Sequence, residues 1–120
     1  AAPHLSQVAA VAAFATGAPH EMMADYRQRR DLAVKLFAEV PWIVMHAPAS
    51  GPYLWGDVRS LTMDTVGFAE RLIEEKKVAI MPGDALGVPG FIRLGYISDD
   101  VATLRDGIRR IVEFGDLKNR

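Results

Sequence analysis

The sequence of 120 residues contains no cysteine. Disulfide bonds, thiolate catalysis and zinc sites built on cysteine are therefore excluded, and a reducing compartment such as the cytoplasm is the expected location. Histidine is also scarce, and the three histidines, His4, His20 and His46, stand too far apart in the sequence to form a metal-binding pair. The sequence accordingly predicts no metal site.

An excess of charge of either sign is absent as well, because 14 basic residues face 15 acidic ones and the formal net charge is −1. A chain so balanced has no electrostatic signature of nucleic-acid or membrane binding, and neither partner is predicted. Long hydrophobic runs are also missing, since the apolar stretch at residues 8–15 is much too short to span a bilayer. No lysine or arginine precedes Arg27, so this stretch does not resemble a signal peptide.

Half of the residues are hydrophobic, which is enough to build the core of one domain. Apolar residues at helical spacing predict helices, whereas β-branched and aromatic runs bounded by turn residues predict strands. The predicted helices cover residues 3–15 and 19–40 and the stretches after Asp64 and Ser98, and the predicted strands cover residues 42–47, 53–58, 78–81 and 91–96. From residue 42 onward the order is ββαββα, which predicts an α+β fold with a small sheet covered by helices on one face.

The ends of the predicted helices carry recognisable signals. Asp64 is expected to cap the third helix. Ser98 is expected to cap the last one, with Asp99 and Asp100 in its first turn. The first helix differs from the others because it is rich in alanine and apolar almost all round, so it needs several partners to bury it. We therefore expect a larger body on the N-terminal side, and the absence of an initiating methionine fits that expectation.

One predicted strand contains a charge among apolar neighbours. The segment "GFIRLGY", residues 90–96, has Arg93 in its middle, and a guanidinium is costly to bury unless an anion meets it. Because side chains alternate along a strand, Ile92 and Leu94 share one face, whereas Arg93 and Gly95 share the other. Gly95 leaves space in which a planar carboxylate can approach Arg93. The alternative interpretation is a solvated face with Arg93 in water, and the strand taken alone favours this alternative.

The other candidate residues favour structural roles. The loop at residues 81–90 lacks the Gly-Lys-Ser/Thr ending of a phosphate-binding loop. The arginines of "RQRRD", residues 27–31, are interpreted as a solvated, ion-paired helix face. Trp42, Trp55 and His46 are interpreted as structural, with the tryptophans in the core. No lysine has the desolvated setting that a Schiff base requires; the lysines are Lys35, Lys76, Lys77 and Lys118.

Several segments, read in order, resemble one enzyme family. The segment "QVAAVAAF" is similar to an alanine-rich helix of that family, and "YRQRRD" is similar to its Y-x-x-R-R-D helix. The segment "PASGPYLW" resembles P-x-G-A-F-Y-x-F, "FAERLIEEKKVAIMPGDALG" resembles a helix–strand–glycine-loop segment, and "GFIRLGY" resembles a G-x-x-R-[IL]-S strand. Over essentially its whole length the chain resembles the C-terminal part of class I/II aminotransferases, which are pyridoxal-phosphate enzymes of fold type I.

The resemblance implies a role for Arg93, because the arginine of this strand binds the α-carboxylate of the amino-acid or 2-keto-acid substrate in that family. It also implies pyridoxal 5'-phosphate as cofactor and a homodimer. The Schiff-base lysine and the other cofactor ligands of the family lie upstream of the matched segment, so no catalytic or cofactor-binding residue is expected in this chain. We therefore predict that the isolated chain does not transaminate.

The resemblance also implies domain boundaries. Residues 1–17 would belong to a large cofactor domain, residues 18–41 would form a linking helix, and residues 42–120 would form the small C-terminal domain. The sequence departs from the family pattern at four places, Ser50, Pro52, Leu86 and Gly95, which leaves the substrate preference open. The alternative function is a stand-alone α+β module that binds a carboxylate metabolite, or regulates in response to it, without catalysis.

Overall fold

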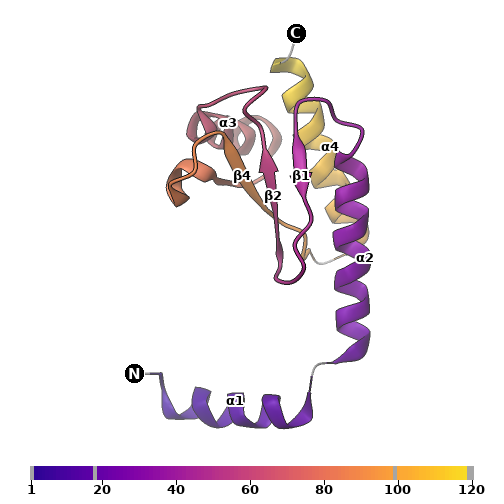
Figure 1. Ribbon diagram of the computed structural model, residues 1–120, viewed down its shortest axis with the longest axis vertical. Helices are drawn as coiled ribbons and strands as arrows, with labels where there is room; N and C mark the ends of the chain where they lie inside the picture. The colour runs from indigo at the N-terminus through magenta and orange to yellow at the C-terminus, as the bar shows by residue number, and fades with distance from the viewer. Residues whose placement is uncertain (1, 18, 99, 119–120) are drawn as a thin grey trace.

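The computed structural model describes residues 2–17, 19–98 and 100–118, so Asp99 and the predicted boundary residue Ala18 lie outside the described residues. Two helices are followed by a mixed set of strands and helices, as Figure 1 shows. The elements are α1 (His4–Thr16), α2 (His20–Phe37), β1 (Val44–His46), β2 (Tyr53–Asp57), α3 (Thr65–Lys76), β3 (Met81–Pro82), the short 3-10 helix η1 (Gly83–Leu86), β4 (Phe91–Gly95) and α4 (Val101–Lys118). The predicted α+β fold is thereby confirmed.

The strands form one antiparallel sheet in the order β1-β2-β4-β3. Strands β1 and β2 are joined as the predicted hairpin, and β4 lies inside the sheet between β2 and β3. In the register of the sheet, Trp55 of β2 and Met81 of β3 flank Arg93 of β4 on its two sides. Arg93 is therefore held in an interior strand, where pairing on both edges fixes the backbone.

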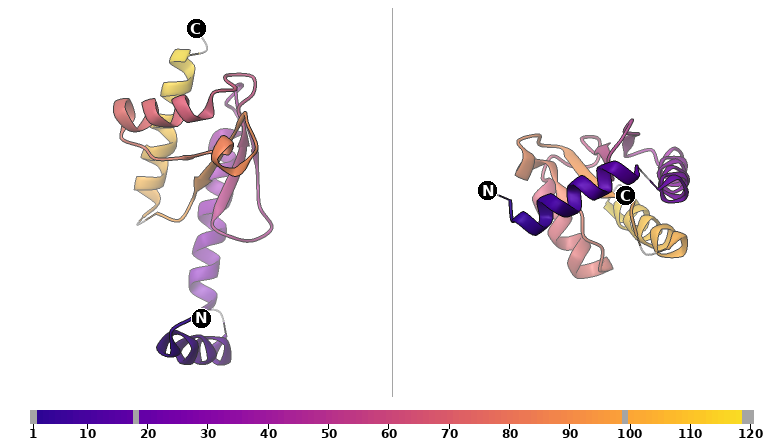
Figure 2. Two further views of the ribbon diagram at one scale, coloured as in Figure 1. Left: turned by 90° about the vertical axis from the view of Figure 1, so that its left-hand side faces the viewer. Right: turned by 90° about the horizontal axis from the view of Figure 1, so that it is seen from below.

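The core lies between one face of the sheet and the helices. Figure 2 shows the helices α3 and α4 on the same side of the sheet, while α2 packs against α4 and the edge strand β1. Leu54 and Ile92 point into this core and are almost fully buried. Helix α4 contributes an apolar stripe at intervals of three and four residues, formed by Leu104, Ile108, Ile111 and Phe114.

Of the two helix caps predicted from the sequence, the cap at Asp64 is confirmed and the cap at Ser98 is wrong. Asp64 caps α3 as predicted, since its carboxylate accepts a hydrogen bond of 2.9 Å from the amide of Gly67. Helix α4 is capped by Asp100 rather than by Ser98, because the Asp100 carboxylate accepts from the amide of Thr103 at 2.6 Å. The hydroxyl of Ser98 donates instead to the carbonyl of Asp100. The helix thus begins two residues later than the predicted cap implies.

All four strands are shorter than predicted, and β1 and β3 differ most from the prediction. Strand β1 begins at Val44, since Trp42 turns into the core, where only 1% of its surface is exposed. Strand β3 consists of Met81 and Pro82 alone. The preceding residues cross from α3 to the sheet, and Pro82, which has no amide hydrogen, leads directly into η1.

Helix α1 stands away from the rest of the molecule, below the foot of α2 in Figure 1. None of its residues, all of which are described, is buried, and Leu5 and Phe14 are 80% and 89% exposed. The radius of gyration of 16.6 Å exceeds the value of about 13.6 Å expected for a compact domain of this length. Among the described residues, no helix is both long enough and apolar enough to cross a membrane.

Candidate carboxylate-binding site

The candidate site lies on the sheet face that the helices leave uncovered. Arg93 projects from β4 to this outer face, opposite to Ile92 and Leu94, as the alternation predicts. Its side chain is half-buried, and the Nε atom is fully buried without a hydrogen-bond partner. No acidic side chain among the described residues forms an ion pair with it. A guanidinium in this state is suited to an external anion.

The surroundings of Arg93 are aromatic and apolar rather than wet. The Cζ atom of its guanidinium lies 4.3 Å from the ring centroid of Tyr53, which is a cation–π contact. Trp55 stands directly opposite Arg93 on β2 and is half-buried on the outer face, so the prediction that it lies in the core was wrong. A side chain at Gly95 would meet only the Tyr53 ring, at 4.0 Å, so this position is nearly open as expected.

A second arginine on the same face already has its carboxylate. Arg59 donates from Nε to Oδ1 of Asp57 at 3.0 Å and from Nη2 to Oδ2 at 2.6 Å, while its Cζ atom lies 5.2 Å from the ring centroid of Phe91. The hydrogen bonds from Arg59 hold the pKa of the Asp57 carboxyl below its ordinary value. The sequence analysis did not identify this ion pair. The pattern that could have predicted it is an aspartate at the end of a strand with an arginine two residues later.

The arginines of α2 are more deeply engaged than a solvated face implies. Arg29 pairs with Asp25 at 2.7 Å and donates to the carbonyl of Ser98, and only 12% of its side chain is exposed. Arg30 donates to the carbonyl of Pro48 at 3.3 Å. The prediction of ion pairing is confirmed, whereas full solvation holds only for Arg27 among these arginines. The contacts connect α2 to the hairpin loop and to the turn that follows β4.

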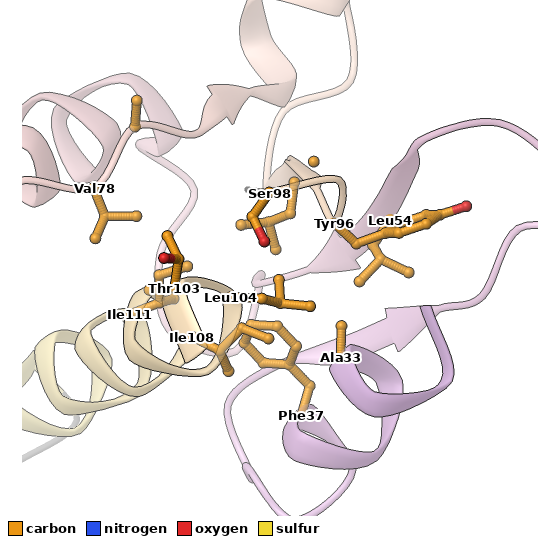
Figure 3. A pocket seen from close by; sticks show the side chains of 14 residues that line it. Ala33, Phe37, Leu54, Val78, Tyr96, Ser98, Thr103, Leu104, Ile108 and Ile111 are labelled. Atoms are coloured by element: carbon orange, nitrogen blue, oxygen red, sulfur yellow. The ribbon is translucent and has the colours of Figure 1, made fainter. Parts of the chain in front are cut away.

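An apolar cavity of about 130 Å³ lies on the other side of the sheet, between β4, α2 and α4 (Figure 3). Phe37, Leu54 and Ile108 contribute to its wall, and the hydroxyls of Ser98 and Thr103 lie at its rim. Because Leu54 and Leu94 face this cavity, Arg93 on the same strand as Leu94 points away from it. The cavity is therefore separate from the candidate site.

The described lysines lie away from Arg93. Lys35 is exposed on α2 and Lys77 is exposed at the C-terminal cap of α3. Lys76 pairs with Glu113 at 3.6 Å, and the side chain of Lys118 lies outside the described residues. None of the described lysines lies on the outer face of the sheet with Arg93. Likewise, the described histidines and acids form no group of three that could hold a metal ion. The chemistry that these residues support is recognition of an anion.

Comparison with known proteins identifies the family of this chain. The family model for aminotransferases of class I and II matches residues 2–111. A probable aspartate/prephenate aminotransferase of Aquifex aeolicus is 36% identical over 95 residues, which cover 77% of this chain and 24% of that protein. The crystal structure of an aspartate aminotransferase from Thermotoga maritima is 35% identical with a TM-score of 0.67, and the match covers 78% of this chain and 24% of that one.

An aromatic aminotransferase from Pyrococcus horikoshii is also similar, with 25% identity and a TM-score of 0.75 over 82% of this chain and 26% of its own. The present chain thus spans about a quarter of the length of the relatives that it matches. The family model, the relatives and the solved structures agree with one another and with the segments that resemble the family in the sequence. The chain belongs to the class I and II aminotransferase family.

Proposed function

We propose that this chain forms the C-terminal part of a pyridoxal-phosphate-dependent aminotransferase, and that Arg93 binds the α-carboxylate of its amino-acid or 2-keto-acid substrate. The observation that carries the proposal is the guanidinium of Arg93, which lies half-buried on the open face of the sheet and has no acidic partner among the described residues. In this proposal the cofactor and its lysine belong to a part of the enzyme outside these residues.

The planar fork of Arg93 explains why an arginine suits this task better than a lysine. Two parallel N–H···O bonds fix both the position and the plane of a carboxylate. Once that plane is fixed, the position of the substrate's Cα is fixed as well, and proton removal from Cα needs such positioning. Arg93 would therefore bind and orient the substrate, without itself exchanging a proton.

The domain assignment belongs to the same proposal. We assign residues 1–17 to a large domain, residues 18–41 to a linking helix and residues 42–120 to the small domain. The exposure of Leu5, Val11 and Phe14 on α1 supports a large apolar neighbour, because monomers rarely leave so many apolar side chains in water on one short helix. A cytoplasmic homodimer completes the proposal.

The test is a substitution of Arg93 in the enzyme that contains this chain. Arg93→Ala should raise KM for amino acid and keto acid by roughly 30- to 1,000-fold, which corresponds to about 2–4 kcal/mol for a charge-assisted bidentate contact. Arg93→Lys should restore only a small part, because an ammonium lacks the fork. Arg59→Lys is the matched control, since Arg59 is occupied by Asp57, and it should leave KM unchanged.

An absorption titration of the 120-residue chain with pyridoxal phosphate tests whether the cofactor site lies in another part of the enzyme. We expect no saturable Schiff-base band, because the described lysines lie on helices or at a helix end, away from Arg93. A saturable band would contradict the assignment of the cofactor site to another part of the enzyme. If the chain alone unfolds cooperatively and binds a carboxylate metabolite saturably, while Arg93→Ala leaves the KM of the parent enzyme unchanged, the stand-alone binding module is the better description.

A further inference from the structure

We propose that Tyr53 is a positioning residue for Arg93: its ring supports one face of the guanidinium, so that an incoming carboxylate meets a fork already held in its plane. This inference rests on the proposed function of Arg93. It goes beyond it, because it assigns the orientation of the fork to a particular side chain on the neighbouring strand. Tyr53 has no reacting atom to contact in this role and acts only through Arg93.

The first support is the geometry of the two strands. Tyr53 stands opposite Gly95 in the register, two pairs along from the Trp55–Arg93 pair and on the same face, so the Tyr53 ring approaches Arg93 diagonally. The separation of 4.3 Å between Cζ and the ring centroid lies well inside the range of a cation–π contact. A Cβ atom at position 95 would lie 4.0 Å from Cε1 of the Tyr53 ring. This is an ordinary van der Waals distance, so the strand register rather than the glycine sets the approach of the ring.

The second support is the shortage of other partners for the guanidinium. Its Nε atom is buried without a hydrogen bond, and the flanking residues in the register, Trp55 and Met81, are apolar. An arginine side chain has several rotatable bonds and loses considerable entropy when a ligand orders it. A ring stacked on the guanidinium reduces that loss in advance, because stacking restricts the plane while leaving the N–H bonds at its edge available.

The third support is the Arg59–Asp57 pair on the same face, in which an arginine contacts a ring and binds a carboxylate at the same time. Arg59 lies over the ring of Phe91 at 5.2 Å and at the same time holds the Asp57 carboxylate through two nitrogens, at 3.0 and 2.6 Å. Contact with a ring and bidentate binding of a carboxylate are therefore compatible on this sheet. Arg93 differs in that its Nε atom is buried, so a carboxylate would be bound by its two terminal nitrogens.

The experiment compares Tyr53→Phe, which keeps the ring, with Tyr53→Leu, which removes it, in the enzyme that contains this chain. We expect Tyr53→Phe to keep KM within about twofold and Tyr53→Leu to raise KM for both substrates roughly five- to thirtyfold, as loss of a partly desolvated cation–π contact implies. The change in kcat should stay below about threefold. Phe91→Leu, the same kind of change under Arg59, should leave KM unaltered.

A second measurement needs no activity. In ¹H–¹⁵N spectra of the 120-residue chain, the Nε–H resonance of Arg93 should be shifted upfield by the Tyr53 ring and protected from exchange because Nε is buried. The upfield shift should survive in Tyr53→Phe and disappear in Tyr53→Leu. A resonance that is the same in Tyr53→Leu as in the unsubstituted chain would overturn the inference.

The two proposals fail in different ways. If Arg93→Ala leaves KM unchanged, the proposed function fails, whatever Tyr53 does. If Arg93→Ala raises KM but Tyr53→Leu and Tyr53→Phe give the same KM, only the role of Tyr53 is refuted. A rise in KM that Phe rescues, together with the loss of the shifted resonance in the Leu variant alone, supports both.

Discussion

Replacing Gly115 by alanine should destabilise the protein, although the same change in a helix usually stabilises. Gly115 is buried in α4, and the ring of Trp42 packs directly against it. A Cβ atom at this position would lie 2.2 Å from Cζ2, 2.4 Å from Cε2 and 2.7 Å from Cη2 of that ring. Atoms of a buried ring cannot retreat into solvent, because only 1% of the Trp42 surface is exposed.

The magnitude follows from three contributions to the free energy of unfolding. Removing a glycine from a helix gains about 1 kcal/mol. Overpacking a well-filled core costs about 1–3 kcal/mol. Displacing the Trp42 ring also weakens the 3.0 Å hydrogen bond from its Nε1 to Asp116, which adds about 1 kcal/mol to the cost. The net expectation is a loss of about 1–3 kcal/mol.

Gly107 in the same helix is the matched control. A Cβ atom there would meet nothing within 4 Å, and the residue borders the apolar cavity of Figure 3. Gly107→Ala should therefore stabilise by about 0.5–1 kcal/mol. Urea unfolding followed by circular dichroism measures both changes as shifts of the midpoint at constant m-value. Equal or greater stability of Gly115→Ala relative to Gly107→Ala would refute the packing argument.

Two further changes test local contacts. The pKa of Asp100 is lowered mainly by the hydrogen bond from the backbone amide of Thr103, so its contribution to stability is complete above the ordinary pKa of 3.8 and is lost as the pH falls through the lower value of the folded state. Asp100→Asn should keep the cap but lose this pH dependence of stability. The difference in unfolding free energy from the unsubstituted chain should therefore be larger at pH 7 than at pH 2.5. An equal difference at both pH values would contradict the role of the Asp100 carboxylate as the cap. Tyr96→Phe removes the hydroxyl that donates to the carbonyl of Gly51 and should cost about 1 kcal/mol in urea unfolding, whereas an unchanged midpoint would show that water replaces this bond.

The sequence is enough to place Arg93 on the outer face of the sheet, because a strand has a strict period of two and Ile92 and Leu94 mark the buried side. The same reasoning misplaces Trp55, since hydrophobicity alone does not distinguish a core residue from one half-buried on the outer face. Likewise, Ile73 of α3 is 47% exposed while Phe68 lies in the core, although both are apolar. Which apolar residues a helix buries depends on its neighbours, which periodicity does not describe.

The contact between Tyr53 and Arg93 also lies beyond the sequence. It depends on the register of β2 against β4, and these strands are separated in the chain by α3, β3 and η1. A hairpin register follows from its turn, but a register between distant strands is fixed by tertiary packing. The Arg29 contact to the carbonyl of Ser98 is unpredictable for the same reason, because it joins residues on elements far apart in the sequence.

These long-range contacts explain how one half-exposed arginine obtains a defined position. Arg30 holds the hairpin loop at Pro48, Arg29 holds the turn after β4 at Ser98, and the hydroxyl of Tyr96 joins β4 back to the hairpin loop. Strand β4 is therefore connected to α2 at the end where Arg93 and Gly95 lie. A displacement of α2 must carry this end of the strand with it or break these hydrogen bonds. The orientation of the Arg93 guanidinium therefore depends on the helix as well as on the sheet.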